Sequence, residues 1–266
     1  MRPNATGGMA TTHCTIAGGV ARVTLARPDV RNAFNAEVIR ELRDTFHALS
    51  EDAAVRAVVL AGEGKSFCGG ADVNWMRGAL DLSYDENVAD AEAMSDMFRA
   101  IDRCSKPVIG RIHGHALGGG AGLTAVCDVA IAESATLFGF TETKLGIIPA
   151  VISPFVIAKI GESHARALFL TGERFEARRA LAVGLVHEVV AAEALDDAVE
   201  RILTELRGSG PHAVAAAKAL IQRVGEASYE DSRIITATAI AKQRTSPEGQ
   251  EGLRAFLERR KASFAE

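Results

Sequence analysis

Two glycine-rich loops are the part of the sequence best suited to chemistry. The first, residues 66–72, and the second, residues 114–120, each follow a short apolar run that reads as a buried strand. Glycine permits positive φ and lets a ligand touch the bare backbone, and ligands of parallel α/β sheets gather at the carboxyl ends of the strands. One N–H group from each loop could therefore hold an oxyanion, a contact worth about 3 kcal/mol per donor in other enzymes. The alternative is that both loops are merely tight turns.

Common nucleotide-binding and nucleophile motifs do not account for these glycines. A GxGxxG fingerprint that starts at Gly118 needs glycine at position 123, which is Leu123, and one that starts at Gly114 needs glycine at Ala116. The chain contains no GxxxxGK[ST] loop and no GxSxG nucleophile elbow. The chemistry must come from another kind of site.

At these loops the sequence resembles the crotonase (enoyl-CoA hydratase/isomerase) superfamily. One such loop would be weak support, whereas several segments in the same order along nearly the whole chain are strong support. The segments are RPDVRNAFN (27–35), FCGGADVNWM (67–76), KPVIGRIHGHALGGGAGLTAVCD (106–128), FGFTETKLGIIP (138–149), TGERFEARRALAVGLVHEVV (171–190) and SPEGQEGLRAFLERRKASF (246–264).

The resemblance implies a spiral β-β-α core, a C-terminal helical trimerisation region and assembly into a homotrimer or a homohexamer built as a dimer of trimers. It implies that the backbone N–H groups of Ala71 and Gly119 hold the oxygen of an acyl-CoA thioester. Ala71, Asp72, Val73 and Asn74 are expected to contact the adenine end of coenzyme A. No metal or redox cofactor is implied, because coenzyme A is part of the substrate.

The resemblance also identifies Glu142 as the group that moves protons. A glutamate between two threonines would by itself be a surface residue, but its place in the segment FGFTETKLGIIP matches one of two family glutamates. A positioned acid or base contributes about a hundredfold to ten-thousandfold to the rate. The other family glutamate corresponds to Gly122, which has no side chain.

Three functions fit this departure. The first is a hydratase or dehydratase of a 2-enoyl-CoA that uses Glu142 with a water or a different partner. Residues 149–161 resemble bacterial methylglutaconyl-CoA hydratases of leucine breakdown, which also tend to carry a small residue at the position of Gly122. The second is a Δ3-Δ2 enoyl-CoA isomerase, in which one base takes a proton from one carbon and returns it to another. The third is a different crotonase chemistry or a catalytically weak acyl-CoA-binding paralogue.

Several other residues have a structural explanation beside a functional one. His113 or His115 could supply the missing partner or anchor the second loop. Asp72 and Asp128 are expected to be structural, Asp72 as a helix cap, and Cys68 and Cys127 to be small packed residues. Trp75 and Met76 either line the acyl pocket or fill the core. Arg27, Arg31 and Lys65 lie on or near the loops expected to meet coenzyme A. Each is either a contact to a phosphate or a solvated charge on the surface.

The elements that must position these residues alternate between strand and helix, which predicts an α/β fold with a largely parallel sheet. Beyond Pro149 we expect four or five helices and only one strand, at 185–190. The division is a disordered tail at 1–9, an α/β core with the acyl-CoA site at 10–195 and a helical region at 196–266. The earlier expected elements are a hairpin (14–17 and 21–25), strands at 55–60, 107–112 and 129–132, and helices after Asn35 and over 88–101.

The bulk composition excludes several classes of protein. A net charge of −4 over 266 residues argues against a nucleic-acid binder. Four widely spaced cysteines form no paired metal spacing and indicate a reducing compartment. No apolar run approaches the roughly 18 residues that span a membrane. The composition therefore predicts a soluble, cytoplasmic protein, and the family resemblance implies an acyl-CoA thioester as its partner.

Overall fold

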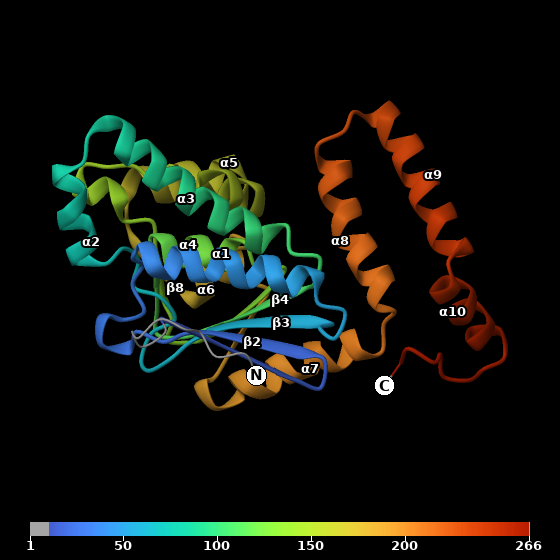
Figure 1. Cartoon of the computed structure of the whole chain (residues 1–266). Coiled ribbons are helices and arrows are strands. Elements are labelled where there is room, and N and C mark those ends of the chain that lie inside the picture. The colour runs from blue at the N-terminus through green and yellow to red at the C-terminus, as the bar shows by residue number, and fades with distance from the viewer. Residues whose placement is uncertain (1–10, 266) are drawn as a thin grey trace.

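Two β-sheets form the centre of the structure, a computed structural model that describes residues 11–265 (Figure 1). Their strands are β1 (Thr12–Ala17), β2 (Val20–Leu25), β3 (Ala57–Gly62), β4 (Val108–Ile112), β5 (His115–Leu117), β6 (Val129–Glu133), β7 (Leu137–Gly139), β8 (Arg174–Glu176) and β9 (Glu188–Val190). The larger sheet has the order β1-β2-β3-β4-β6-β9 and is parallel except for the β1–β2 hairpin. The smaller sheet has the order β5-β7-β8. The tail predicted at residues 1–9 lies outside the described residues.

Helices cover both faces of the larger sheet. The helices of the described residues are α1 (Ala36–Glu51), α2 (Val73–Gly78), α3 (Tyr84–Asp102), α4 (Gly119–Ala125), α5 (Ser153–Thr171), α6 (Ala177–Ala182), α7 (Leu195–Arg207), α8 (Pro211–Gly225), α9 (Tyr229–Thr245) and α10 (Pro247–Leu257). Helices α1 and α3 lie over one face and α7 lies under the other (Figure 1). Successive side chains of a strand point to opposite faces, so Val58 and Leu60 join the core of α1, while Ala57 and Val59 pack with α7.

The first half of the chain folds as its sequence pattern predicts. The hairpin of β1 and β2 is confirmed, with Cys14 opposite Val23. Asn35 caps α1 by accepting a hydrogen bond of 2.9 Å from the Val38 amide, as its short polar side chain allows. The buried face of α1 is the expected apolar stripe, Val38, Ile39, Leu42, Phe46 and Leu49.

The smaller sheet differs from the sequence prediction. Strand β8 lies beyond Pro149, where only residues 185–190 were expected to form a strand, and the strand found there, β9, is shorter than that range. Strands β5, β7 and β8 are three residues long, and such short strands show no period-two alternation. They are held by pairing and by a stacked contact of the Phe138 and Phe175 rings, 5.9 Å apart. The second glycine loop, residues 114–120, contains β5, so its first half is a strand and this sheet positions it.

The last three helices stand apart from the sheets (Figure 1). Helix α7 packs on the larger sheet through Val199 and Leu203, so the projecting part begins at α8 rather than at residue 196. An ion pair of 2.6 Å between Lys218 and Asp128 joins α8 to the core. Helices α8 and α9 contain no buried residue. None of the helices within residues 11–265 has both the length and the apolar character to span a bilayer.

Candidate active site

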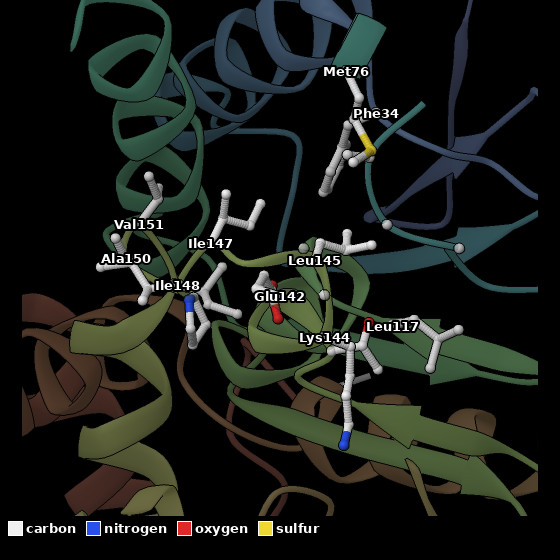
Figure 2. A pocket seen from close by; sticks show the side chains of 18 of the residues that line it. Phe34, Met76, Leu117, Glu142, Lys144, Leu145, Ile147, Ile148, Ala150 and Val151 are labelled. Atoms are coloured by element: carbon white, nitrogen blue, oxygen red, sulfur yellow. The ribbon is translucent and has the colours of Figure 1, made fainter. Parts of the chain in front are cut away.

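A cavity of about 900 Å³ lies where the two glycine loops meet helices α2 and α3 and the segment that follows β7. Its wall contains all three residues predicted to do the chemistry, Ala71, Gly119 and Glu142. Figure 2 shows the Glu142 side chain in this cavity, with Phe34 and Met76 across from it. The first loop and α2 form one wall, and the second loop with the Glu142 segment forms the other.

The two glycine loops run side by side because a parallel β-bridge joins Cys68 to Ala116. Two backbone hydrogen bonds of 2.9 and 3.1 Å hold this bridge. Ala71 and Gly119 each lie three residues beyond a member of the bridge. The pairing therefore carries both residues to the same end of the cavity, although the two loops are far apart in the sequence.

Two glycines keep the loops this close. Gly70 has φ 99°, and a Cβ placed on it would lie 3.0 Å from the Leu117 carbonyl oxygen. Gly118 has φ 51°, and a Cβ placed on it would lie 3.1 Å from Oε1 of Glu142. Both conformations disfavour a side chain. The same two positions thus permit the loop contact and leave the Glu142 carboxyl directly against the second loop.

The amides of Ala71 and Gly119 are free to bind a ligand. The neighbouring amides of Asp72 and Gly118 each donate to a backbone carbonyl at 2.8 Å. Within residues 11–265, neither the Ala71 nor the Gly119 amide donates to another group, and both residues line the cavity. Gly119 is also the first residue of α4, where an N–H has no partner within the helix. Their role as an oxyanion hole stays a prediction with this geometry in its favour.

Glu142 is placed as an isolated carboxyl. It begins a 3-10 turn, Glu142–Leu145, and its Oε2 is buried with no hydrogen-bond partner among the described residues. No salt bridge joins it to a basic residue in that part of the chain. Burial raises the pKa of Glu142, and a hydrogen bond from its own amide only partly opposes the shift. A carboxyl with a raised pKa and an unpaired oxygen, in the wall of a cavity, is suited to proton transfer.

The comparisons with known proteins agree with this geometry. The family model described as enoyl-CoA hydratase/isomerase matches residues 15–266. The chain is 34% identical over 247 residues to the crotonyl-CoA hydratase of Syntrophomonas wolfei, covering 92% of this chain and 94% of that protein. The chain belongs to the enoyl-CoA hydratase/isomerase family. It is an enzyme of the hydratase or isomerase type, and it acts on an acyl-CoA thioester.

Solved structures confirm the predicted crotonase fold. AtuE of Pseudomonas aeruginosa matches with a TM-score of 0.94 and 38% identity, over 96% of this chain and 100% of that one. An enoyl-CoA hydratase of Shewanella pealeana matches with a TM-score of 0.91 and 36% identity, over 95% of each chain. The α/β core and the C-terminal helices are thus those of the crotonase superfamily.

At Gly122 this family member has no room for a second glutamate. A Cβ placed on Gly122 would lie 2.4 Å from Cγ2 of Ile152 and 3.1 Å from the Phe98 ring. Real Cβ atoms do not approach other atoms to 2.4 Å. The departure seen in the sequence is therefore built into the packing, because Ile152 fills the space that a longer side chain would need.

Among the residues expected at the adenine end of coenzyme A, Asp72 is buried and hydrogen-bonded, whereas Val73 and Asn74 are exposed. Asp72 is buried and caps α2 by accepting from the Asn74 amide at 2.8 Å, and it accepts from Arg27 at 2.7 Å. Burial alone would raise the pKa of Asp72, but these bonds and the Arg27 charge hold it below its usual value. Val73 and Asn74 are exposed and lie outside the cavity wall. Their contact with coenzyme A stays a prediction.

The two histidines support the second loop and lie outside the cavity wall. His113 Nε2 lies 3.0 Å from the Gly64 carbonyl oxygen, and His115 Nδ1 lies 3.2 Å from the Ser66 hydroxyl. Burial, together with the charges of Arg31 and Arg174, lowers the pKa of His115. His115 thus ties the second loop to the first, and His113 ties the residues just before the two loops together. The anchoring explanation is the one that these contacts favour.

Other candidates from the sequence are structural. Cys68 and Cys127 are buried, and burial raises the pKa of each thiol to about 12. Asp128 accepts a hydrogen bond from the Val108 amide and pairs with Lys218. The four cysteines are free thiols, and no group of residues in 11–265 has the make-up of a metal site.

The three basic residues near the first loop differ in their contacts. The Arg27 guanidinium is taken by Asp72 and by the Ala33 carbonyl oxygen. Arg31 lines the cavity. Lys65 is exposed and lies outside the cavity wall. Of the three, Arg31 is thus the one placed to meet a phosphate of a bound ester.

One of the groups in the cavity wall that the sequence prediction missed is the carboxyl of Asp90 on α3. It lies four residues before Met94, on the edge of the apolar stripe that predicted this helix. Residues four apart share a helix face. The apolar position of Met94 therefore indicated that Asp90 lies toward the same side of α3. Trp75 and Met76, predicted either to line the pocket or to fill the core, both lie in the cavity wall.

A pH profile tests the state of Glu142. We expect kcat/KM to fall on the acid side as the pH drops through the raised pKa, because protonated Glu142 can no longer accept a proton. The midpoint of this limb should lie above 4.5, the usual value for glutamate. A rate that stays level down to pH 4.5, with the fold intact by circular dichroism, would contradict a base with a raised pKa.

Proposed function

We propose that the protein hydrates a 2-enoyl-CoA ester, or dehydrates the matching 3-hydroxyacyl-CoA, with Glu142 as the proton-transfer group. The observation that supports this most directly is one isolated carboxyl beside two free loop amides in the same cavity. The second loop itself offers no acid or base to the cavity, and Glu142 is the carboxyl that lies against it. The reaction needs no metal or redox cofactor.

The proposed reaction uses the two loop amides and the Glu142 carboxyl. The amides of Ala71 and Gly119 donate to the thioester oxygen, which gains negative charge as the enolate forms. Glu142 takes a proton from water while the water oxygen bonds to C3 of the substrate. The carboxyl then gives a proton to C2, the enolate collapses to the thioester, and H and OH have been added across the double bond. Glu142 ends as it began, ionised.

Isomerisation of a 3-enoyl-CoA is the second candidate. The packing of Ile152 against Gly122 leaves Glu142 without a glutamate partner from that position. A single base is sufficient to remove a proton from C2 and return one to C4, and such a reaction needs no bound water. The same oxyanion hole would stabilise the dienolate.

Methylglutaconyl-CoA, a substrate of leucine breakdown, is the narrower candidate within the hydratase class. It rests on the pattern of residues 149–161, which includes part of the cavity wall. For assembly, we propose a homotrimer or a homohexamer. Large apolar side chains exposed on α9 and α10 support this proposal: Ile234, Ile240, Leu253, Phe256 and Leu257.

Absorbance of the conjugated thioester distinguishes these functions. Hydration of crotonyl-CoA or methylglutaconyl-CoA should bleach the band, and isomerisation of a 3-enoyl-CoA should create it. We expect bleaching with at least one 2-enoyl ester at a rate well above that of the Glu142→Gln variant. A band that appears only with the 3-enoyl ester would replace the hydratase by the isomerase. No change with any of the esters would reject both.

A further inference from the structure

Asp90 is a second carboxyl in the active-site cavity, and the proposed reaction does not use it. It lies on α3, in the part of the wall that also contains Trp75, Met76, Ala79 and Met94. These neighbours are apolar apart from the indole N–H of Trp75. Helices α2 and α3 thus present one carboxyl in an otherwise apolar surface, opposite the segment that carries Glu142.

The surroundings of Asp90 leave its carboxyl without a charged partner. Burial raises the pKa of Asp90, and the nearby Trp75 side chain only partly opposes this shift. No lysine, arginine or histidine within residues 11–265 forms a salt bridge with Asp90. Glu173, another carboxyl of the cavity wall, is by contrast paired with Arg179 at 2.8 Å. Asp90 therefore retains acceptor capacity that the protein itself does not use.

The basic residues of the cavity come from other elements. Arg31, Lys144 and Arg174 line it, and Arg31 and Arg174 are close enough to His115 to lower the pKa of that histidine. None of the three contributes to the pKa of Asp90, which is shaped by burial and by Trp75. Helices α2 and α3 thus contribute an acidic group and no basic group to the cavity wall.

From this arrangement we propose that Asp90 selects the acyl chain, by accepting a hydrogen bond from a neutral donor such as a hydroxyl and by repelling a distal carboxylate. A carboxyl in a cavity wall that has no charged partner in the protein discriminates between ligands that donate a hydrogen bond to it and ligands that do not. Two carboxylates without a cation between them repel. This inference rests on the proposed function, because it assumes that an acyl chain occupies the cavity. It favours neutral acyl groups over the methylglutaconyl group.

Binding of saturated esters tests the proposal without relying on turnover. The probes are pentanoyl-CoA, 5-hydroxypentanoyl-CoA and glutaryl-CoA, together with the matching hexanoyl, 6-hydroxyhexanoyl and adipoyl esters. None has a double bond to hydrate, so Kd is measured directly by calorimetry. For the wild type, we expect at least one dicarboxylic ester to bind about tenfold or more weakly than its unsubstituted partner. We expect its hydroxylated partner to bind at least as well as the unsubstituted ester.

Two substitutions isolate the carboxyl. Asp90→Asn removes the charge at nearly constant shape and should bring the dicarboxylic ester to within about threefold of the unsubstituted one. Asp90→Ala should abolish any preference for the hydroxylated ester. Asp96→Asn is the matched control, because Asp96 is exposed on the same helix and lies outside this cavity. It should keep the wild-type order of affinities.

Three outcomes would overturn the proposal. One is equal binding of all three ester types by the wild type. Another is an order of affinities that Asp90→Asn leaves unchanged. The third is a fall of about a hundredfold in kcat for crotonyl-CoA in Asp90→Asn with unaltered discrimination, which would make Asp90 part of the reaction. If the proposed function fails instead, crotonyl-CoA is not turned over, yet the affinity order of the saturated esters still reports on Asp90.

Discussion

Glu142→Gln should lower kcat for the best 2-enoyl-CoA substrate by about a hundredfold to ten-thousandfold, which is the usual contribution of a positioned acid or base. Glutamine keeps the shape of the side chain but cannot take a proton from water or return one to C2. The two loop amides remain in place, so the Kd for a saturated acyl-CoA should stay within about threefold of the wild-type value. Stopped-flow absorbance and calorimetry measure the two quantities on the same preparation.

The matched control is Glu162→Gln. Glu162 is a glutamate on α5 with a side chain 76% exposed, and it forms only a loose pair of 3.6 Å with Arg166. It lies outside the cavity wall, so its replacement should leave kcat unchanged. A rate for Glu142→Gln equal to that of this control would reject the proton-transfer role, whatever the affinity for the ester.

Stability should move in the opposite direction to activity in Glu142→Gln. Because the pKa of Glu142 is raised in the folded state, the native protein binds this proton more tightly than the unfolded chain does. The stabilisation from this bound proton is complete below the pKa that Glu142 has in the unfolded chain. It is lost as the pH rises through the higher pKa that Glu142 has in the folded protein. At neutral pH the ionised carboxyl therefore destabilises the fold, and the variant should show a higher Tm. This gain should shrink as the pH falls toward 4.5, the usual value for glutamate.

The sequence predicts the loops of the site well because their constraints are local. Glycines at 70 and 118 are needed where a side chain would strike a carbonyl oxygen or the Glu142 carboxyl, and such positions are visible in a sequence. The stripe of α1 and the cap at Asn35 are local in the same sense. The bridge between Cys68 and Ala116 is not local, yet it follows once both loops end parallel strands.

The sequence does not reveal what depends on packing between distant segments. The sequence shows that Gly122 has no side chain, but only the fold shows that Ile152 occupies the space beside it. Asp90 looks like one of several acidic residues on a solvated helix, and its place in the cavity depends on how α3 lies against α2. Strand β8 has three residues and gains its pairing from β7, far earlier in the chain. None of these contacts leaves a periodic pattern.

Gly122→Glu is the second substitution for which we expect a large effect, and it should destabilise the protein rather than restore a two-glutamate hydratase. The new Cβ would lie 2.4 Å from Cγ2 of Ile152, so the segment that carries Ile152 must move. Overpacking of this kind costs about 1–3 kcal/mol, and a buried carboxyl without a partner adds to that cost. We expect a lower Tm and no gain in crotonyl-CoA hydration.

A second variant separates the clash from the chemistry. Gly122→Glu with Ile152→Ala removes the clashing Cγ2 and leaves Cβ of residue 152 at 3.1 Å, so part of the lost stability should return. Gly225→Glu is the control, because Gly225 ends α8 and a Cβ there would meet no atom within 4 Å. It should change Tm little.

The Tm and the rate of crotonyl-CoA hydration then show whether packing or chemistry excludes a glutamate at position 122. If Gly122→Glu folds as stably as the wild type, Ile152 is not what excludes a glutamate from this position. If the single variant hydrates crotonyl-CoA efficiently, a second carboxyl needs no prepared surroundings in this site. If only the double variant gains activity, the packing of Ile152 against Gly122 is the physical difference between this active site and one with two glutamates.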